Sequence, residues 1–344
     1  EVQISHLGPL KEDKEHDGEL KEFNYGQSVL IEYRVNGKER KDLLASMKRN
    51  IFGHQHFYDR AKGMLLDYSC FNKLPRHVNA LDVGYYSKNH RFKSTADCGE
   101  FFLLREMVEG SEYHHDLDRI LTKDEYTNLD ESRVIALANY LADIHEVKHD
   151  EGSLYTRRIR ELLGHGECIM GLTDSYPRNL SFTGAEELKE IEKKCVDWRY
   201  KIKDKTDRLC QVHGDFHPWN VLFRGGTDFS VLDRSRGEWG EAADDVTCMT
   251  INFLFYALQS KGDVKGCFLD LFNLFWETYL DLTEDFEILS VAAPFYAWRG
   301  LVLASPLWYP DLKDDLRRKI FNFIHQVLAL DELHFHDVPR MFEG

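Results

Sequence analysis

Three polar side chains between residues 213 and 233 have the types and spacing that phosphoryl transfer requires. Asp215 and Asn220 lie in one short polar stretch, and Asp233 follows thirteen residues after Asn220. A carboxylate can align an attacking hydroxyl and accept its proton, while an amide oxygen and a second carboxylate can bind the Mg²⁺ ions that neutralise nucleotide phosphates. The pattern predicts Asp215 as the catalytic base and Asn220 and Asp233 as Mg ligands. The alternative is structural, with Asp215 and Asn220 only capping a turn.

Short apolar runs around these residues indicate the elements that position them. Residues 210–212 precede the polar stretch and residues 221–223 follow it, which predicts a strand, a turn and a second strand. A further apolar run at 229–232 ends directly before Asp233. The polar side chains are therefore expected where short strands meet a turn.

The order His-Gly-Asp, four residues, Asn, followed by Asp233, resembles the loop of the aminoglycoside phosphotransferase and choline kinase superfamily. The resemblance is sharp from 212 to 246. It implies a small-molecule kinase with ATP and Mg as cofactors and a small-molecule acceptor. It also implies an α+β fold of the two-lobed, protein-kinase-like kind. A small antiparallel-sheet lobe at 1–107 would bind the nucleotide, and a larger, mainly helical lobe at 108–344 would carry catalysis and the acceptor.

The resemblance also assigns nucleotide contacts to the first hundred residues. An alternating apolar run at 29–35, followed by an Asn-Gly pair, predicts a hairpin that covers the phosphates in this family. Residues 24–28 would form the covering loop, and Lys48, at the end of the next strand, would contact the phosphates. A helix is expected over 56–71, without the glutamate that pairs with the lysine in the family, and Asp59 or Asp67 is offered as its substitute.

Residues 100–110 predict a buried strand that ends in the hinge between the lobes. In the family, main-chain groups at the hinge bind the adenine edge, which places Glu106 and Val108 among the nucleotide contacts. After Asp233 the chain departs from the family's Asp-Phe-Gly, because two arginines, Arg234 and Arg236, follow. Beside a metal ligand they would compete with Mg unless directed elsewhere, and phosphate oxygens are one possible target.

Other residues are expected to support the loop or the core. Asp245 resembles a buried aspartate of the family that anchors the catalytic loop through backbone hydrogen bonds. His145 falls on the apolar stripe of a helix predicted over 132–147 and is interpreted as a core group. His213 and His217 are interpreted as braces of the loop, because no thiols or carboxylates accompany them at zinc-ligand spacing.

The amino-acid composition limits the classes of protein to which the chain can belong. The 344 residues are 43% hydrophobic and 30% charged, as in ordinary globular proteins. A net charge of −15 argues against nucleic-acid binding and against an anionic membrane surface. Seven scattered cysteines predict free thiols in a reducing cytoplasm. No run has the length of a membrane span, and the sequence does not indicate an oligomeric state.

A loose lead-in is expected over 1–22, and helices over 185–203 and most of 247–344.

The acceptor is predicted to be cationic, as an amino alcohol or an aminoglycoside is. The acidic balance would attract such a molecule, with Glu238 and Glu241 near the cleft mouth, and Trp298 and Trp308 could offer ring faces to an ammonium group. Two alternatives stay open. A catalytically weak or degenerate kinase-like nucleotide-binding protein would explain the single glycine in the covering loop and the missing helix glutamate. An atypical protein kinase would need an activation segment, which the short passage 233–245 does not resemble.

Overall fold

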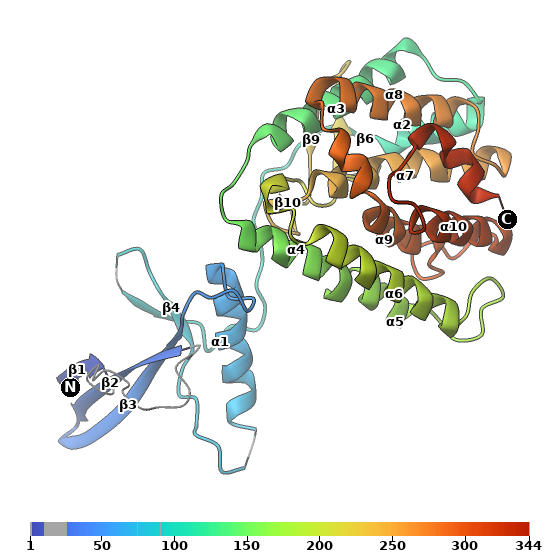
Figure 1. Cartoon of the computed structure of the whole chain (residues 1–344). Helices are drawn as coiled ribbons and strands as arrows, with labels where there is room; N and C mark the ends of the chain where they lie inside the picture. The colour runs from blue at the N-terminus through green and yellow to red at the C-terminus, as the bar shows by residue number, and fades with distance from the viewer. Residues whose placement is uncertain (1, 10–25, 74, 90, 344) are drawn as a thin grey trace. The chain divides into compact units, whose positions relative to one another are not determined.

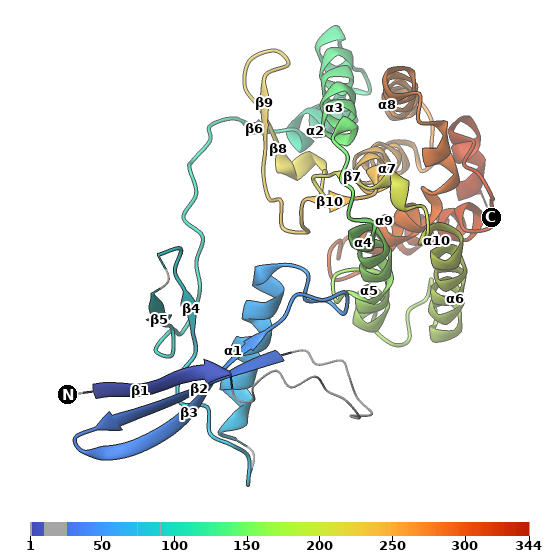
Figure 2. The same ribbon diagram turned by 60° about the vertical axis from the view of Figure 1, so that its left-hand side comes forward.

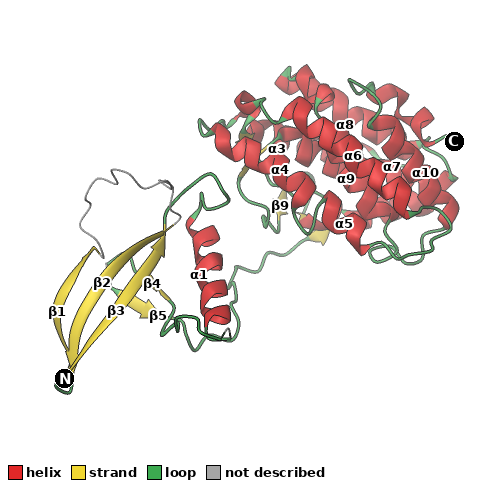
Figure 3. Cartoon of the chain, turned by 60° about the horizontal axis from the view of Figure 1, so that its bottom comes forward, coloured by secondary structure: helices red, strands yellow, loops and turns green. Residues whose placement is uncertain are grey.

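The computed structural model describes residues 2–9, 26–73, 75–89 and 91–343. The chain separates into two compact units, Glu1–Arg105 and Glu106–Gly344. The first contains antiparallel sheets and a helix, and the second is mainly helical (Figures 1 and 3). The expected α+β class is confirmed. The assignment of 1–107 to the nucleotide and of 108–344 to catalysis and the acceptor stays a prediction.

A three-stranded antiparallel sheet opens the first unit (Figure 2). The hairpin predicted at the Asn-Gly pair is confirmed, since Asn36 and Gly37 both have positive φ, 49° and 81°, as a type I′ turn requires. A third strand pairs with this hairpin and corrects the expected loose lead-in, at least for residues 2–9. It satisfies backbone groups that the hairpin alone would leave at an edge. The strands, in the order of the sheet, are β1 (Val2–Pro9), β2 (Gly26–Val35) and β3 (Lys38–Met47).

One helix and a small hairpin complete the first unit. The predicted helix is confirmed as α1 (Phe57–Phe71), and His56 with Asp59 forms a capping box at its start. The hairpin consists of β4 (Gly84–Tyr86) and β5 (Phe92–Ser94). Among the described residues of this unit only Gln55 is fully buried, so the unit has little core of its own.

The buried strand predicted at 100–110 is wrong. These residues form neither helix nor strand, and Phe102 and Leu104 are 91% and 88% exposed. Their apolar composition favours burial, but a strand also needs a neighbour to accept its backbone hydrogen bonds. Within the described ranges no strand pairs with this stretch.

The second unit is organised around α7 (Ala242–Lys261), which is buried at every residue from Ala242 to Leu258. It packs against α8 (Cys267–Thr283) and α9 (Ala293–Ala304), while α3 (Asn128–Glu146) lies against α8 and α10 (Asp314–Val327) against α9 (Figures 1 and 2). The helices predicted at 132–147, at 185–203 and over most of the last hundred residues are confirmed. The bounds are α2 (His114–Lys123), α3 (Asn128–Glu146), α4 (Gly152–Gly164), α5 (Ile169–Ser175), α6 (Ala185–Ile202), α8 (Cys267–Thr283), α9 (Ala293–Ala304) and α10 (Asp314–Val327), with 3₁₀ turns η1 (Thr206–Arg208), η3 (Phe286–Ser290) and η4 (Phe335–Phe342).

Two small sheets of the second unit hold the polar stretch. Before it, β7 (Cys210–Gln211) pairs with β10 (Trp239–Gly240). The stretch ends in the 3₁₀ turn η2 (Pro218–Asn220). The next strand, β8 (Val221–Phe223), is the middle strand of a sheet with β6 (Ser111–Glu112) and β9 (Phe229–Val231). The predicted strand, turn and strand are confirmed. Within the described residues, no helix combines the length and apolar character that a membrane crossing requires.

Candidate active site

The first turn of α7 anchors the polar loop between β7 and β8. The carboxylate of Asp245 accepts hydrogen bonds from the backbone N–H groups of His213 and Gly214, both at 2.7 Å. Burial alone would raise the pKa of Asp245, but His145 and the amide of His213 outweigh it and the pKa is lowered. The anchoring role predicted for Asp245 is confirmed. Gly214 has a φ of 86°, which suits a residue without a side chain.

The histidines serve as supports. His145 is buried, with Nδ1 2.8 Å from the Tyr279 hydroxyl and Nε2 3.2 Å from the Asp245 carboxylate. His213 Nδ1 accepts the N–H of Asp215, and His217 Nδ1 accepts the N–H of Trp219. His213 and His217 thus brace the loop backbone, and His145 is a buried core group that contacts the Asp245 anchor, as expected of these residues.

Two arginines and a histidine surround the carboxylate of Asp215. Arg299 Nη1 lies 2.8 Å from Oδ1, while Arg236 Nη2 and His217 Nε2 lie 3.6 and 3.7 Å from Oδ2. Burial would raise the pKa of Asp215, but Arg299, Arg236 and His217 together lower it to about 2. Asp215 is therefore an ionised carboxylate with both oxygens directed by neighbouring cations.

Arg299, in the middle of α9, connects this carboxylate to the protein interior. Its Nη2 donates to Gly214 O at 3.1 Å and to Asp244 Oδ1 at 2.9 Å, and its guanidinium carbon lies 3.7 Å from the centre of the Trp298 ring. Asp244 is also paired with Arg158. Our sequence reasoning missed Arg299 as part of the site. The available signal was a lone arginine within the apolar run of α9, since a buried charge requires a partner.

The β8–β9 hairpin brings Asn220 and Asp233 into neighbouring positions. Val221 pairs with Val231, and Leu232 N–H donates to Asn220 O at 2.8 Å. Leu232 therefore faces Asn220, and Asp233 is the residue that follows it. Asn220 Nδ2 donates to the backbone oxygen of Asp215 at 3.0 Å, which orients the amide and leaves Oδ1 for another partner. Asp233 is exposed and has a φ of 55°.

These two oxygen donors suit Mg²⁺, which prefers carboxylate and amide oxygens and retains several waters. In the described part of the chain no hydrogen bond or ion pair engages the Asp233 carboxylate, whereas Asp215 is engaged by cations. The donor set therefore fits a metal at Asn220 and Asp233 better than at Asp215. These roles remain a proposal.

The two arginines after Asp233 have protein partners. Arg234 donates to the backbone oxygens of Val212 and Glu238, at 3.0 and 3.1 Å. Arg236 pairs with Glu167 at 3.0 Å, in addition to approaching Asp215. Both side chains thus brace the loop, so their charges are directed away from Asp233, the proposed metal ligand.

Two residues expected to attract the acceptor are otherwise engaged. Glu241 is fully buried, pairs with Arg208 at 2.7 Å and accepts the hydroxyl of Tyr155, so it belongs to the core and not to the cleft mouth. Trp298 is 1% exposed, with the guanidinium groups of Arg299 and Arg236 over its ring. Both expectations are wrong for the same reason. Glu241 and Trp298 already interact with arginines of this chain, so neither is available to a cationic acceptor. Glu238 and Trp308 are exposed.

The remaining predicted residues lie near or before the boundary of the two units. Lys48 directly follows β3 and is exposed, and no ion pair engages its ammonium group in the described residues. Of its two suggested partners, Asp59 closes the capping box of α1. Glu106 and Val108 lie in the irregular stretch before β6. In the expected covering loop, Asn24 and Tyr25 fall outside the described residues and Gly26 begins β2.

Comparison with known proteins places the sequence in a broad family. A model of the phosphotransferase enzyme family matches residues 71–261. A search of curated proteins finds no match.

Several solved structures are similar. An ethanolamine kinase of Plasmodium vivax is 17% identical, with the match covering 92% of this chain and 78% of that one, at a TM-score of 0.36. An amicoumacin kinase in complex with AMP-PNP, Ca²⁺ and its ligand is 14% identical over 91% of this chain and 85% of that one, at 0.43. An ADP-bound aminoglycoside phosphotransferase is 14% identical over 99% and 93%, at 0.31.

Proposed function

The chain belongs to the phosphotransferase enzyme family, and on this premise we propose that it transfers the γ-phosphate of ATP to a hydroxyl group of a small molecule. It is a small-molecule kinase, and the nucleotide, the metal and the acceptor are the proposed details. The observation that carries the proposal is the joint placement of Asp215, Asn220 and Asp233 on one buried loop and the adjoining hairpin.

Asp215 would act mainly by aligning the acceptor hydroxyl. A carboxyl with a pKa of about 2 is a weak base, so it removes the proton late, as the bond to phosphorus forms. A loose phosphoryl-transfer transition state suits this, because it demands positioning and charge neutralisation more than a strong base. Arg299 and the Asp245 anchor hold the carboxylate in place before the acceptor binds.

Asn220 and Asp233 would hold Mg²⁺, which neutralises charge on the nucleotide's phosphates when bound. Lys48 would contact the phosphates, and the main chain at Glu106 and Val108 the adenine edge. These nucleotide contacts rest on the family's pattern in the sequence. The seven free cysteines suit the reducing cytoplasm in which we propose that the enzyme works.

The acceptor we propose is a small hydroxyl-bearing cation. The net charge of −15 favours such a molecule electrostatically. Because Glu241 and Trp298 are engaged within the protein, the attraction would come from exposed acids such as Glu238.

A panel of matched acceptors tests this proposal. Amino alcohols, aminoglycosides, neutral sugars and hydroxy acids are incubated with the enzyme, ATP and Mg²⁺, and ADP formation is measured at low and high salt. Turnover of cationic members that falls with salt is expected, with Asp215→Asn as the inactive control. Turnover restricted to neutral or acidic members would refute the cationic acceptor, and ADP formation equal in the Asp215→Asn control would refute the catalytic assignment.

The degenerate alternative, nucleotide binding without transfer, draws on Lys48, which is exposed and lacks an ion pair within the described residues. It predicts that Mg-ATP stabilises the protein while no member of the panel is phosphorylated. A thermal shift without turnover would therefore favour it over the kinase.

A further inference from the structure

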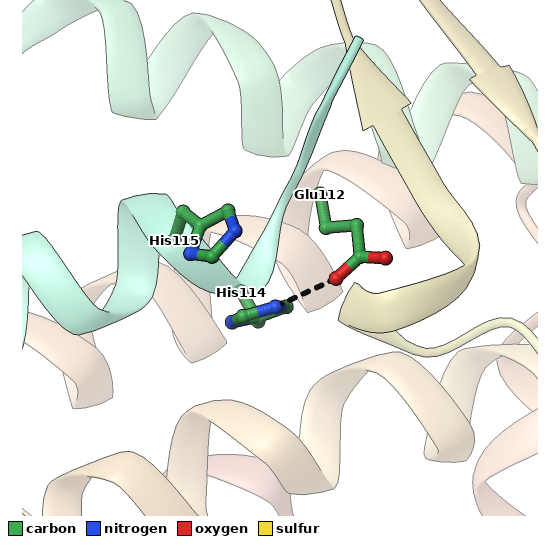
Figure 4. A group of neighbouring side chains, drawn as sticks. All are labelled: Glu112, His114 and His115. Atoms are coloured by element: carbon green, nitrogen blue, oxygen red, sulfur yellow. Dashed lines mark hydrogen bonds and ion pairs between the residues drawn. The ribbon is translucent and has the colours of Figure 1, made fainter. Parts of the chain in front are cut away.

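We propose that Glu112, His114 and His115, at the junction of β6 and α2, form a binding site for a divalent transition-metal ion of the zinc class. One ligand atom from each of the three side chains can be chosen so that all lie within 4.8 Å of one another. Figure 4 shows the carboxylate of Glu112 pointing at the ring of His114, with the ring of His115 beside it. The inference concerns only the second unit and is independent of the phosphotransferase proposal.

The donor set identifies the class of ion. Two imidazoles and one carboxylate, with water completing the shell, are a common set for Zn²⁺. Mg²⁺ prefers oxygen ligands alone, so it would use Asn220 and Asp233 and not this cluster. The side chains of Glu112 and His115 are 43% and 61% exposed, which gives an ion access from solvent.

The contacts of His114 show which of its ring nitrogens would face the ion. Its Nδ1 lies 3.2 Å from Asp118 Oδ2, and its Nε2 lies 2.8 Å from Glu112 Oε2. A neutral imidazole has a single N–H, so it can donate to only one of the two carboxylates. When Nδ1–H donates to Asp118, the Nε2 lone pair faces the Glu112 carboxylate, and an ion bound there would have both groups as ligands.

Asp118 has the position of an outer-shell carboxylate. Metal-bound histidines usually donate their second N–H to such a group, which fixes the tautomer and the ring. Here Asp118 is itself fixed, because its Oδ1 accepts the hydroxyl of Tyr256 at 2.8 Å. Two ligands at about 2 Å from Zn²⁺ are about 3.3 Å apart in a tetrahedral site. The exposed Glu112 side chain can open its 2.8 Å contact to that separation.

The cluster is joined to the catalytic loop by backbone and by a ring contact. Tyr113 N–H donates to Val221 O at 2.9 Å, and Glu112 pairs with Leu222 in the sheet. The His114 ring stacks on Trp219, with centroids 5.1 Å apart and an angle of 20° between the planes. Trp219 directly precedes Asn220, so an ion that fixes His114 would also restrain this part of the loop.

The test is a Zn²⁺ titration of the full chain, freed of metal by dialysis against a chelator and measured in competition with a chromophoric chelator. One tight equivalent is expected, together with visible absorption bands of tetrahedral Co²⁺ when cobalt is the probe. Trp219 emission should change on loading, and Trp219→Phe should abolish that change. Excess Mg²⁺ should not displace the ion.

Variants locate the site. His115→Ala and Glu112→Gln should each weaken Zn²⁺ binding by at least about tenfold, and Asp118→Asn by ~10–100-fold, the range for loss of an outer-shell partner. His336→Ala is the matched control, because His336 is an exposed histidine 3.8 Å from one carboxylate, Glu277. It should leave binding unchanged. Absence of a tight equivalent would show that only a proton bridges His114 and Glu112, and equal affinity in His115→Ala, Glu112→Gln and wild type would place the ion elsewhere; either result overturns the proposal.

Discussion

The two aspartates of the candidate active site lie in opposite surroundings. Asp215 is nearly buried and in contact with Arg299, while Asp233 is exposed and free of ion pairs in the part of the chain that the structure describes. A carboxylate whose charge is already balanced by arginines has little affinity left for a metal, whereas an exposed one retains it. The protein's own arginines therefore neutralise and orient Asp215, whereas Asp233 is available to an added cation.

Replacing Asp215 should produce the largest effect. Asp215→Ala is expected to lower kcat by ~10²–10⁴-fold, the usual contribution of a positioned acid–base group. Asp215→Asn keeps the shape and should be similarly impaired. Turnover is measured as ADP formation with the acceptor found in the panel, and the Mg-ATP thermal shift serves as a check of folding. Activity within a few-fold of wild type in a folded variant would remove Asp215 from the reaction.

The second-largest expected effect is a loss of stability when Arg299, the partner of Asp215, is replaced. Arg299→Leu leaves Asp215 and Asp244 without one of their cations in the interior, so the free energy of unfolding should fall by ~3–5 kcal/mol. Arg299→Lys retains the charge and should lose less. The exposed pair Arg224–Asp228 supplies the control, because Arg224→Leu should cost no more than ~1 kcal/mol.

The free energies of unfolding are measured from urea unfolding curves, fitted with one common slope (m-value) for wild type and variants. If Arg299→Leu destabilises the protein no more than Arg224→Leu does, the buried network is not a determinant of stability. A normal stability combined with a large loss in kcat would instead assign Arg299 to catalysis alone.

Replacing Asp233 should erase the metal-dependent part of nucleotide binding. A ligand at about one hundred times its Kd stabilises the folded state by ~2.7 kcal/mol. The melting temperature should therefore rise with ATP and Mg²⁺ more than with ATP and a chelator, and Asp233→Asn should abolish the difference. Glu238→Gln, an exposed acid on the same segment, is the matched control. A difference that survives in Asp233→Asn would exclude Asp233 as a metal ligand.

Acid should cause a two-stage loss of stability. Burial, the largest cause, lowers the pKa of His217 from 6.5 to about 4, so the unfolded chain binds the proton more readily between these values. Stability should thus fall as the pH drops from about 6.5 to 4. The pKa of Asp215 is lowered from 3.8 to about 2, so its contribution, present above about pH 4, is lost as the pH falls towards 2.

At about 1.4 kcal/mol per pKa unit, the upper stage should amount to at most about 3 kcal/mol and the lower one to at most about 2 kcal/mol. Urea unfolding at a series of pH values separates them, because His217→Gln should remove the upper stage and leave the lower one. A variant whose acid profile is identical to that of the wild type would show that His217 does not titrate differently in the two states.

Local pattern was sufficient for much of the fold. The Asn36-Gly37 turn, the α1 helix and the periodic stripe of α3 were all predicted, because each depends on neighbours within a few residues. The strand predicted at 100–110 failed, because local composition does not supply a partner for its backbone hydrogen bonds. The strand β1 was missed for the converse reason, since its pairing with β2 is long-range.

The sequence by itself determined the kinds of groups at the candidate site, since Asp215, Asn220 and Asp233 are fixed by a short motif and one hairpin. Tertiary structure decided their surroundings. Arg299 reaches Asp215 from 84 positions along the chain, and Asp245 anchors the loop from 31 and 32 positions away. Spacing in sequence cannot show which charges meet after the helices pack. Electrostatic interactions depend on distance and burial in space, so the pKa of Asp215 and the engagement of Glu241 and Trp298 appear only in the folded chain.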